Sequence, residues 1–416
     1  MAPTPSLDDS KIHDSKIHDS KIHDSKIHDS KIHDSKIHDA KIHENVRSRD
    51  LAPQNEDRHE FSRGHEHRPT LKHPRWNPRF WTRKVWIGFA AINMMATVLV
   101  VSAAVARTRE GSSYPDYSPL TYTLKDTYAG ESFFDHFNYK TGDDPTHGFV
   151  HYVPREEALF RNLTYATPST AVLRVDTAVG PDSKPDASTG RFSARIESKK
   201  TYDGGLFIFD VKHTPYACGV WPALWLTDPF HWPEHGEIDV LESINEGNDG
   251  NAMTLHSTDG CTMSVERKQT NPSLHDDCHH KAYKNAGCGV KEPDATFGAA
   301  INDAGGSIMA VEWRTAGIRM WRFARDAIPY DITTKKPYPA GWGAASADFP
   351  STECDIGAHF KNHSIVVNID LCGDLVSENW EQSGCPSTCT DLVANQPDLF
   401  GTAFWEFGSF EVYQKS

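Results

Sequence analysis

The first half of the chain contains no cysteine, and all eight cysteines of the 416 residues fall between Cys218 and Cys389. Disulfide bonds are therefore excluded from the residues before Cys218. Clustered in this way, the cysteines indicate that the later part folds in an oxidising compartment, with up to four disulfides whose pairing the spacing does not fix. Zinc is a weaker interpretation, because Cys385 and Cys389 form one loose pair with no matching second pair. We predict no metal site and no cofactor.

The sequence is also poor in positive charge. The formal net charge is −14, and residues 107–416 carry 26 lysines and arginines against 43 acidic residues. An acidic domain repels the phosphates of nucleic acids, so we exclude nucleic acid as a partner. A neutral ligand meets no such repulsion, and the 11 tryptophans and 13 tyrosines suit a protein that stacks aromatic rings against one.

Residues 1–84 lack any pattern from which a hydrophobic core could form. The pentapeptide "SKIHD" occurs six times from Ser10 to Asp39, and "AKIHE" follows at Ala40–Glu44. A period of five matches neither the helix nor the strand repeat, so the isoleucines never line up on one face. We expect a disordered tail of mixed charge, with a metal-binding or pH-sensing histidine tract as the alternative.

Charge is missing altogether from residues 85–106, "VWIGFAAINMMATVLVVSAAVA". As a helix, this segment is long enough to cross the hydrocarbon core of a bilayer. More basic residues flank its amino side than its other side, which predicts a cytoplasmic tail and a lumenal or extracellular remainder. We therefore expect a single-pass type II membrane protein with an uncleaved signal-anchor. Cleavage after Ala106, at an A-x-A pattern, is the alternative.

The remainder shows no long stretch with the helical repeat. Residues 107–125 are predicted to form a short stem rich in serine, proline and tyrosine. Over residues 126–416, runs such as "RFSARIESK", "GLFIFDV" and "HSIVVNIDL" are typical of short β-strands. We predict an all-β domain, a sandwich or jelly roll with substantial loops. Two N-glycosylation acceptors, Asn162 and Asn362, fall within it.

The stretch "WPEHGEIDVLESIN" carries three carboxylates at an uneven spacing, Glu237, Asp239 and Glu242. In a regular strand Glu237 and Asp239 would share a face, and Glu242 would point the other way. One extra residue between Val240 and Glu242 would turn the apolar Leu241 away and bring all three acids to one face. Bulges of this kind occur beside active sites, so we predict a β-bulge here.

Three acids on one face suit a particular chemistry. Neighbouring negative charges raise one carboxyl pKa, so that one acid stays protonated near neutrality while another is ionised. Glycoside hydrolysis requires this division between an acid and a nucleophile or base. A solvent-facing acidic edge strand and a calcium site are the alternatives. Trp221, Trp225 and Trp232 just before the acids favour a sugar-binding site, and Trp232, between prolines and charges, is the best stacking platform.

The segment "GEIDVLE" resembles the E-x-D-x-x-E signature of glycoside hydrolase family sixteen, in the laminarinase branch that carries an extra bulge residue. The resemblance runs from about Asp126 to the end of the chain. It implies a β-jelly roll of two curved antiparallel sheets with a concave cleft. It also implies an endo-acting, retaining enzyme on β-1,3 or mixed β-1,3/1,4 glucans. Six further blocks, in order, are similar to the fungal endo-β-1,3(4)-glucanases: "GFVHYVPREEA", "GRFSARIESKKTY", "CGVWPALWL", "TLHSTDGCTM", "AVEWRTAGIRMW" and "VVNIDLCGD".

The resemblance also implies roles for the acids, carried over by their positions in the motif. Glu237 would be the nucleophile that forms the glycosyl-enzyme. Glu242 would be the general acid and then the general base. Asp239, between them, would orient or tune the nucleophile.

Substrate-binding residues follow from the resemblance with one departure. Trp225 and Trp232 match family tryptophans on the donor side. His256 lies in the next predicted strand and would face the acids if that strand pairs antiparallel. The family's aromatic after "CGD" is replaced here by Leu375, and the nearest tryptophan is Trp380. The preferred glucan linkage therefore stays open.

Two other functions compete with hydrolysis of a β-glucan by a monomeric enzyme. A transglycosylase on the same fold would pass the same covalent intermediate to a sugar hydroxyl instead of water. A non-catalytic glucan-binding module is the other alternative, and the intact set of three acids argues against it.

Overall fold

The computed structural model describes residues 78–110 and 114–416 of the chain. Of the disordered tail predicted over residues 1–84, residues 1–77 with the repeats lie outside the described residues. Residues 78–84 differ from the prediction, because they include a 3-10 helix at Pro78–Phe80 and the start of the long helix at Arg83.

The apolar segment forms a long helix, α1 (Arg83–Glu110), after a short 3-10 helix, η1 (Pro78–Phe80). An 18-residue window within Arg83–Val101 has a mean hydropathy of 1.8, and the large apolar side chains of this segment are exposed. The amide of Asn93 is satisfied within the helix, because it donates to the backbone oxygen of Phe89 at 2.9 Å. By length and composition alone, α1 is sufficient to span a bilayer.

The stem predicted over residues 107–125 is shorter in the structure. Helix α1 continues to Glu110, since residues 107–110 contain neither glycine nor proline, the residues that end helices. The first strand already begins at Tyr122, so the β-domain starts before residue 126.

The residues just before the first strand are attached to the domain. The hydroxyls of Tyr114 and Tyr117 both donate to the carboxylate of Asp348. Lys268 lies 3.8 Å from the centre of the Tyr114 ring, and the Arg319 guanidinium lies 4.1 Å from that of Tyr117. We call these five residues the tyrosine hook.

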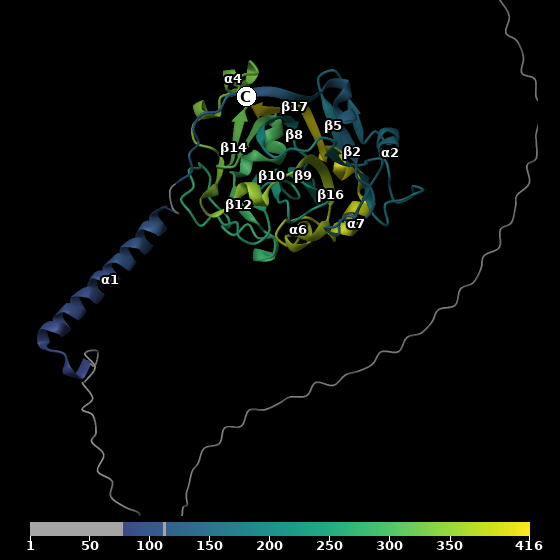
Figure 1. Cartoon of the computed structure of the whole chain (residues 1–416). Helices are drawn as coiled ribbons and strands as arrows, with labels where there is room; N and C mark the ends of the chain where they lie inside the picture. The colour runs from purple at the N-terminus through teal and green to yellow at the C-terminus, as the bar shows by residue number, and fades with distance from the viewer. Residues whose placement is uncertain (1–77, 111–113) are drawn as a thin grey trace, which may run out of the picture. The chain divides into compact units, whose positions relative to one another are not determined.

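Two large antiparallel sheets form the domain (Figure 1). The order in the eight-stranded sheet is β15-β14-β13-β8-β17-β5-β4, with β1 paired to β17, and the order in the seven-stranded sheet is β12-β11-β10-β9-β16-β7-β2. A small parallel pair, β3 and β6, is the exception to the predicted antiparallel pairing. Both large sheets mix strands that are distant in sequence, which is expected of a sandwich rather than of a simple meander.

The strands of the eight-stranded sheet are β1 (Tyr122–Ala129), β4 (Thr164–Ala166), β5 (Ala171–Arg174), β8 (Gly205–His213), β13 (Ser307–Arg314), β14 (Gly317–Ala324), β15 (Ala347–Pro350) and β17 (Phe404–Lys415). The strands of the seven-stranded sheet are β2 (Phe137–Tyr139), β7 (Arg195–Ser198), β9 (Val220–Thr227), β10 (Glu237–Glu242), β11 (Ala252–His256), β12 (Cys288–Lys291) and β16 (Ser364–Leu371). The parallel pair is β3 (Val150–Tyr152) and β6 (Arg191–Ser193).

Short helices connect the strands. The α-helices are α2 (Arg155–Phe160), α3 (Gly298–Asp303), α4 (Tyr330–Thr333), α5 (Ile356–His359), α6 (Gly373–Glu378) and α7 (Cys389–Asn395). The 3-10 helices are η2 (Gly130–His136), η3 (Ala282–Lys284), η4 (Asp294–Thr296), η5 (Pro339–Gly341), η6 (Ser351–Glu353) and η7 (Pro397–Thr402).

The main hydrophobic core lies between the two large sheets. Strand β8 of one sheet contributes Phe207 and Phe209, and strand β9 of the other contributes Leu224 and Leu226, all fully buried. Residues two apart on a strand share a face, so the intervening residues of β9, such as Trp225, lie on the outer face of the seven-stranded sheet. This outer face carries the acidic motif.

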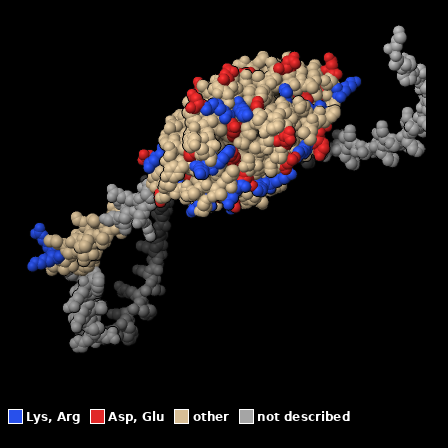
Figure 2. Space-filling view, turned by 90° about the horizontal axis from the view of Figure 1, so that it is seen from above, with Lys and Arg blue, Asp and Glu red and all other residues tan. Residues whose placement is uncertain are grey.

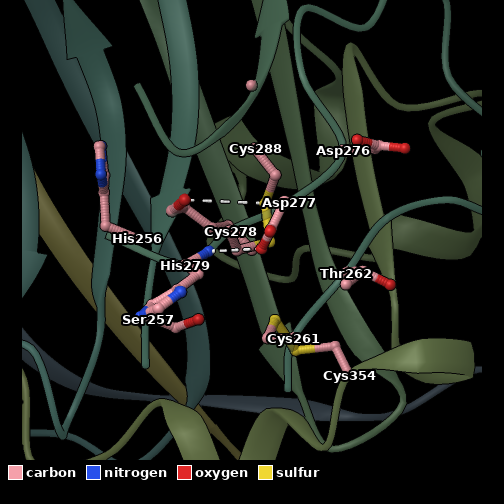
Figure 3. The surroundings of a disulfide bond; sticks show 12 residues. His256, Ser257, Cys261, Thr262, Asp276, Asp277, Cys278, His279, Cys288 and Cys354 are labelled. Atoms are coloured by element: carbon pink, nitrogen blue, oxygen red, sulfur yellow. Dashed lines mark hydrogen bonds between the residues drawn. A yellow bond between two sulfur atoms is a disulfide. The ribbon is translucent and has the colours of Figure 1, made fainter. Parts of the chain in front are cut away.

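All eight cysteines are paired. Figure 3 shows two of the bonds around the loop that follows β11, close to His256. The number of disulfides agrees with the sequence prediction, which left the pairing open. The pairs are Cys218–Cys385, Cys261–Cys354, Cys278–Cys288 and Cys372–Cys389.

Acidic and basic side chains are interspersed on the domain face that Figure 2 shows.

Candidate active site

Strand β10 carries the three acids and contains the predicted bulge. Its register with β9 shifts between Asp239 and Leu241, and its register with β11 shifts between Asp239 and Glu242. The extra residue opposite β9 is therefore Val240, one position earlier than predicted. Both Val240 and Leu241 are fully buried in the core, which a regular strand would not allow for consecutive residues.

The bulge leaves the acids on the outer face of the sheet. Glu237 and Glu242 are half-buried, whereas Asp239 is 2% exposed. Carboxylate oxygens of Glu237 and Asp239 and a ring nitrogen of His256 lie within 4.8 Å of one another. The sequence prediction that the acids meet on one face is thus confirmed for Glu237 and Asp239.

A buried asparagine holds the bulge in place. Asn251 Oδ1 accepts a hydrogen bond from the backbone N–H of Glu242 at 2.9 Å, and Asn251 Nδ2 donates to the backbone oxygen of Val240 at 3.1 Å. The same Nδ2 donates to the Glu292 carboxylate at 2.8 Å, and Glu292 is bonded in turn by Arg322 of the opposite sheet. A bulge removes regular sheet hydrogen bonds, and the Asn251 side chain replaces them. It thereby fixes the backbone of Glu242.

His256 faces the acids, as predicted. It lies opposite Glu237 in the antiparallel pairing of β10 with β11, and its Nε2 is 3.3 Å from Asp239 Oδ2. Its Nδ1 is 3.2 Å from Asn285 Oδ1, which fixes the orientation of the ring. Asp239 Oδ2 is buried and makes no well-aligned hydrogen bond to any described residue, so this ion-pair contact with His256 is its main compensation.

Asp239 and Glu242 hold their protons more tightly than isolated carboxyls do, because the pKa of each is raised. Burial and the charge of Glu237 raise the pKa of Asp239 well above its usual range. Burial also raises the pKa of Glu242, and the hydrogen bond from Trp221 offsets part of this rise. Burial would lower the pKa of His256, but the contact with Asp239 and the surrounding negative charge raise it to about 9. The site therefore favours a protonated Glu242, as a general acid requires.

Two of the predicted tryptophans are fixed through their ring nitrogens. Trp221 Nε1 donates to Glu242 Oε1 at 2.9 Å, so this residue orients an acid directly. Trp225 Nε1 donates to Asn368 Oδ1 at 2.8 Å, and the Arg195 guanidinium lies over its ring at 4.9 Å. Both rings are partly exposed on the outer face. Their stacking against sugars stays a prediction.

Trp232 lies in the loop between β9 and β10. It is 40% exposed, and its ring meets His280 edge-on with the ring centres 5.4 Å apart. Phe230 in the same loop is 87% exposed. An accessible indole five residues before Glu237 fits a stacking platform, which stays a prediction.

The chain has Leu375 where the family places an aromatic after "CGD", and the nearest tryptophan is Trp380. Leu375 occupies helix α6, while the Trp380 ring packs against the core and its Nε1 donates to the backbone oxygen of Ser387 at 3.0 Å.

The two predicted glycosylation acceptors, Asn162 and Asn362, are both exposed. Their hydroxyl partners Thr164 and Ser364 are buried. Attachment of a glycan at either site stays a prediction.

Sequence reasoning missed the polar residues that position the site: Arg195, Asn251, Asn285 and Asn368. Each acts through contacts that tertiary structure creates, on another strand or loop. The stretch "GNDGN" around Asn251 predicts a turn, and nothing in it signals that its last side chain reaches back to the bulge.

Known proteins with similar sequences belong to one enzyme family. Residues 137–413 match the family described as an XgeA-like catalytic domain of glycoside hydrolase family 16. A probable glycosidase of Schizosaccharomyces pombe is 41% identical over 313 residues, which cover 74% of this chain and 73% of that protein.

Solved structures agree in fold with this match. Laminarinase 16A from Phanerochaete chrysosporium, with 6-O-glucosyl-laminaritriose in its donor and acceptor sites, is 39% identical with a TM-score of 0.67. The likeness covers 71% of this chain and 100% of that one, and it confirms the predicted jelly roll. A β-1,3-glucosyltransferase described as elongating is 35% identical with a TM-score of 0.65, covering 70% of this chain and 100% of that one.

Several other similar proteins are much longer than the segment that matches this chain. This chain spans 45%, 46% and 48% of three proteins, from Aspergillus flavus, Aspergillus clavatus and Emericella nidulans, that are 33–35% identical to it.

Proposed function

Because the chain belongs to glycoside hydrolase family 16, we propose that it is an endo-acting β-glucanase that cleaves β-1,3 or mixed β-1,3/1,4 glucans with retention. The observation that carries this proposal is the bulged strand β10, which presents Glu237, Asp239 and Glu242 beside His256 and Trp221. Relatives and neighbours named for endo-1,3(4)-β-glucanase or laminarinase activity support the same substrate class.

The first step forms a covalent intermediate. Glu242, whose pKa is raised by burial, donates its proton to the glycosidic oxygen, while a carboxylate oxygen of Glu237 bonds to the anomeric carbon and the sugar–sugar bond breaks. The Trp221 indole holds Glu242 in position for this transfer. Asp239, paired with His256, sits beside Glu237 and adjusts its charge.

The second step releases the sugar. The Glu242 carboxylate now accepts a proton from water, the water oxygen bonds to the anomeric carbon, and the bond to Glu237 breaks. Two inversions at one carbon give overall retention of configuration.

Incubation of the purified full chain with laminarin, lichenan, β-1,6-glucan and xyloglucan tests this proposal. Products sized by chromatography should be short oligosaccharides from laminarin, lichenan or both, and NMR should show the β-anomer first. Absence of cleavage, or first appearance of the α-anomer, would overturn it.

A transglycosylase is the second candidate, supported by the likeness to the elongating β-1,3-glucosyltransferase. It would use the same two steps, with a sugar hydroxyl in place of water. With laminari-oligosaccharides as the sole substrate, products longer than the input identify transfer, whereas only shorter products identify hydrolysis.

We also propose that α1 anchors the protein as a single-pass type II membrane protein, with the β-domain in the lumen or outside the cell. The apolar helix, its basic amino-terminal flank and the four disulfides support this orientation. Protease added to sealed microsomes should spare the β-domain, and degradation of the domain would contradict the proposal.

A further inference from the structure

The loop between β9 and β10 gathers two histidines around one buried carboxylate. His231 Nδ1 lies 2.9 Å from Asp228 Oδ2, and His235 Nδ1 lies 2.7 Å from the same oxygen. The three ligand atoms lie within 4.8 Å of one another. Asn362 Nδ2 also donates to this oxygen, at 2.8 Å. We call Asp228, His231 and His235 the loop triad.

Local structure produces this convergence. The backbone N–H of His235 donates to the oxygen of His231 at 2.9 Å, so the two residues stand one helical turn apart on the same side. Their rings stack with centres 4.6 Å apart. The Asp228 side chain is fixed in position, because its Oδ1 accepts a hydrogen bond from the backbone N–H of Phe230 at 3.0 Å and because it is only 1% exposed.

We propose that the loop triad binds a divalent transition-metal ion of the Zn²⁺ class, a site separate from the acids of β10. Imidazole nitrogens and a carboxylate oxygen are ligands that Zn²⁺ prefers, at about 2.0–2.2 Å. Tetrahedral coordination at that distance places ligand atoms roughly 3.3 Å apart, so the contacts of 2.7 and 2.9 Å must open by about half an ångström.

The exposure of the triad fits such a site. His231 is 59% exposed and is free to make that adjustment, while the buried Asp228 stays fixed. Solvent reaches the exposed side and can supply the fourth ligand. The Asn362 amide would remain as the outer hydrogen bond that orients the carboxylate, a feature common to metal sites.

A neighbouring histidine fixes the backbone of the loop that carries the triad. His363 is fully buried and donates through Nε2 to the backbone oxygen of His235, and its ring packs against that of Trp313 with the ring centres 4.8 Å apart. The backbone at His235 is therefore held in place independently of any bound ion.

The position of the site suggests its effect on the enzyme. A metal ion would restrict the motion of the loop between β9 and β10. This loop carries the exposed Phe230 and Trp232, and it ends where β10 begins, at Glu237. Metal binding would therefore order the predicted sugar platform and lower KM for long glucans, with little change in kcat.

Thermal unfolding of the full chain with increasing Zn²⁺ tests the site without reference to activity. We expect a saturable rise of the β-domain melting temperature, roughly 5 °C at a hundredfold excess over Kd. His231→Asn should abolish the rise and should fold, because this side chain is largely exposed. Co²⁺ in place of Zn²⁺ should give a visible absorption band that His231→Asn loses.

The matched control is His147→Asn, which removes an exposed histidine paired with one carboxylate, Asp374, at 3.0 Å. This variant should keep the full response. The histidines of residues 1–44 are present in every variant, so their own metal binding cancels in the comparison. The proposal is overturned if Zn²⁺ raises the melting temperature of His231→Asn and of the parent equally, or if it does not raise that of the parent. The loop triad would then be joined by hydrogen bonds alone. Either result leaves the proposed glucanase activity untouched.

Discussion

At the scale of single residues, the hydrogen bonds of Asn251 predict a role in placing the general acid. Asn251→Ala removes the acceptor for the Glu242 backbone N–H and leaves the buried Glu292 carboxylate without one of its partners. We expect a loss of about 2–3 kcal/mol in the free energy of unfolding and a roughly 10–100-fold drop in kcat on laminarin.

A second substrate separates positioning of the acid from general damage. Aryl glycosides with an acidic leaving group need little proton donation, so Asn251→Ala should lose much less activity on dinitrophenyl β-laminaribioside than on laminarin. Equal losses on both substrates would mean that Asn251 acts through stability alone. Asn302→Ala, which removes another side-chain amide bonded to the backbone, provides the matched stability control.

The two glutamates should differ in the same assay. Glu237→Gln removes the nucleophile and should reduce kcat by at least about 10³-fold on both substrates, while glucan binding persists. Glu242→Gln should lose comparable activity on laminarin yet retain much of the first step on the dinitrophenyl glycoside. The measurement is single-turnover release of dinitrophenol. A Glu237→Gln variant with near-normal turnover would contradict the assigned roles.

His256 should make stability depend on pH. Its pKa in the folded protein is about 9, against about 6.5 for an unperturbed histidine, so the folded state binds the extra proton between these values. This contribution is complete below pH 6.5 and disappears as the pH rises through 9, at most about 3 kcal/mol. Urea unfolding of the parent should show this decline, and His256→Asn should flatten it. A parent stability that is constant over this range would contradict the prediction.

At the scale of an element, the loop from Cys278 to Cys288 supports the site from outside the sheet. It carries Asn285, whose Oδ1 holds His256 Nδ1, and the disulfide closes it between β12 and the segment after β11 (Figure 3). Replacing both cysteines with serine should cost about 2–3 kcal/mol from loop entropy and should also lower kcat/KM, because Asn285 loses its fixed place. Denaturation and initial rates measure the two effects.

Asn285→Ala serves as the partner variant. It should lower kcat/KM and should cost only about 1 kcal/mol of stability, because the loop stays closed but alanine is less favourable than asparagine at the left-handed φ of 66°. A double-serine variant with reduced stability but unchanged kcat/KM would separate the loop from the site.

Strands and the bulge in β10 could be predicted from the sequence, whereas the contacts that loops make with the site could not. Strands repeat every two residues, so short runs such as "GLFIFDV" indicated the sandwich, and the spacing of Glu237, Asp239 and Glu242 indicated the bulge. Asn251 and Asn285 were not predictable, because each contacts its target only after loops of other strands fold back. A local pattern gives the face of a strand and carries no signal for a hydrogen bond made by a distant loop.

At the scale of the whole molecule, the boundary of the β-domain depends on the tyrosine hook. Sequence placed the domain start at residue 126, but Tyr117 reaches Asp348, 231 residues later in the chain. No local pattern signals so distant a contact. Gly317 makes room for the Tyr117 side chain, because a Cβ at this position would lie 1.8 Å from the Tyr117 hydroxyl. Residues 114–121 are therefore part of the domain rather than a stem.

Removing the hook should weaken the whole domain. In the full chain, Tyr114→Ala combined with Tyr117→Ala eliminates two hydroxyls bonded to the buried Asp348 and two rings that cover Lys268 and Arg319. We expect the free energy of unfolding to fall by about 2–4 kcal/mol, since Asp348 keeps its charge and loses two donors. Tyr330→Ala, at a ring that is 81% exposed, should have almost no effect. If the two variants prove equally stable in urea, the hook contributes no stability and the domain boundary returns to the first strand.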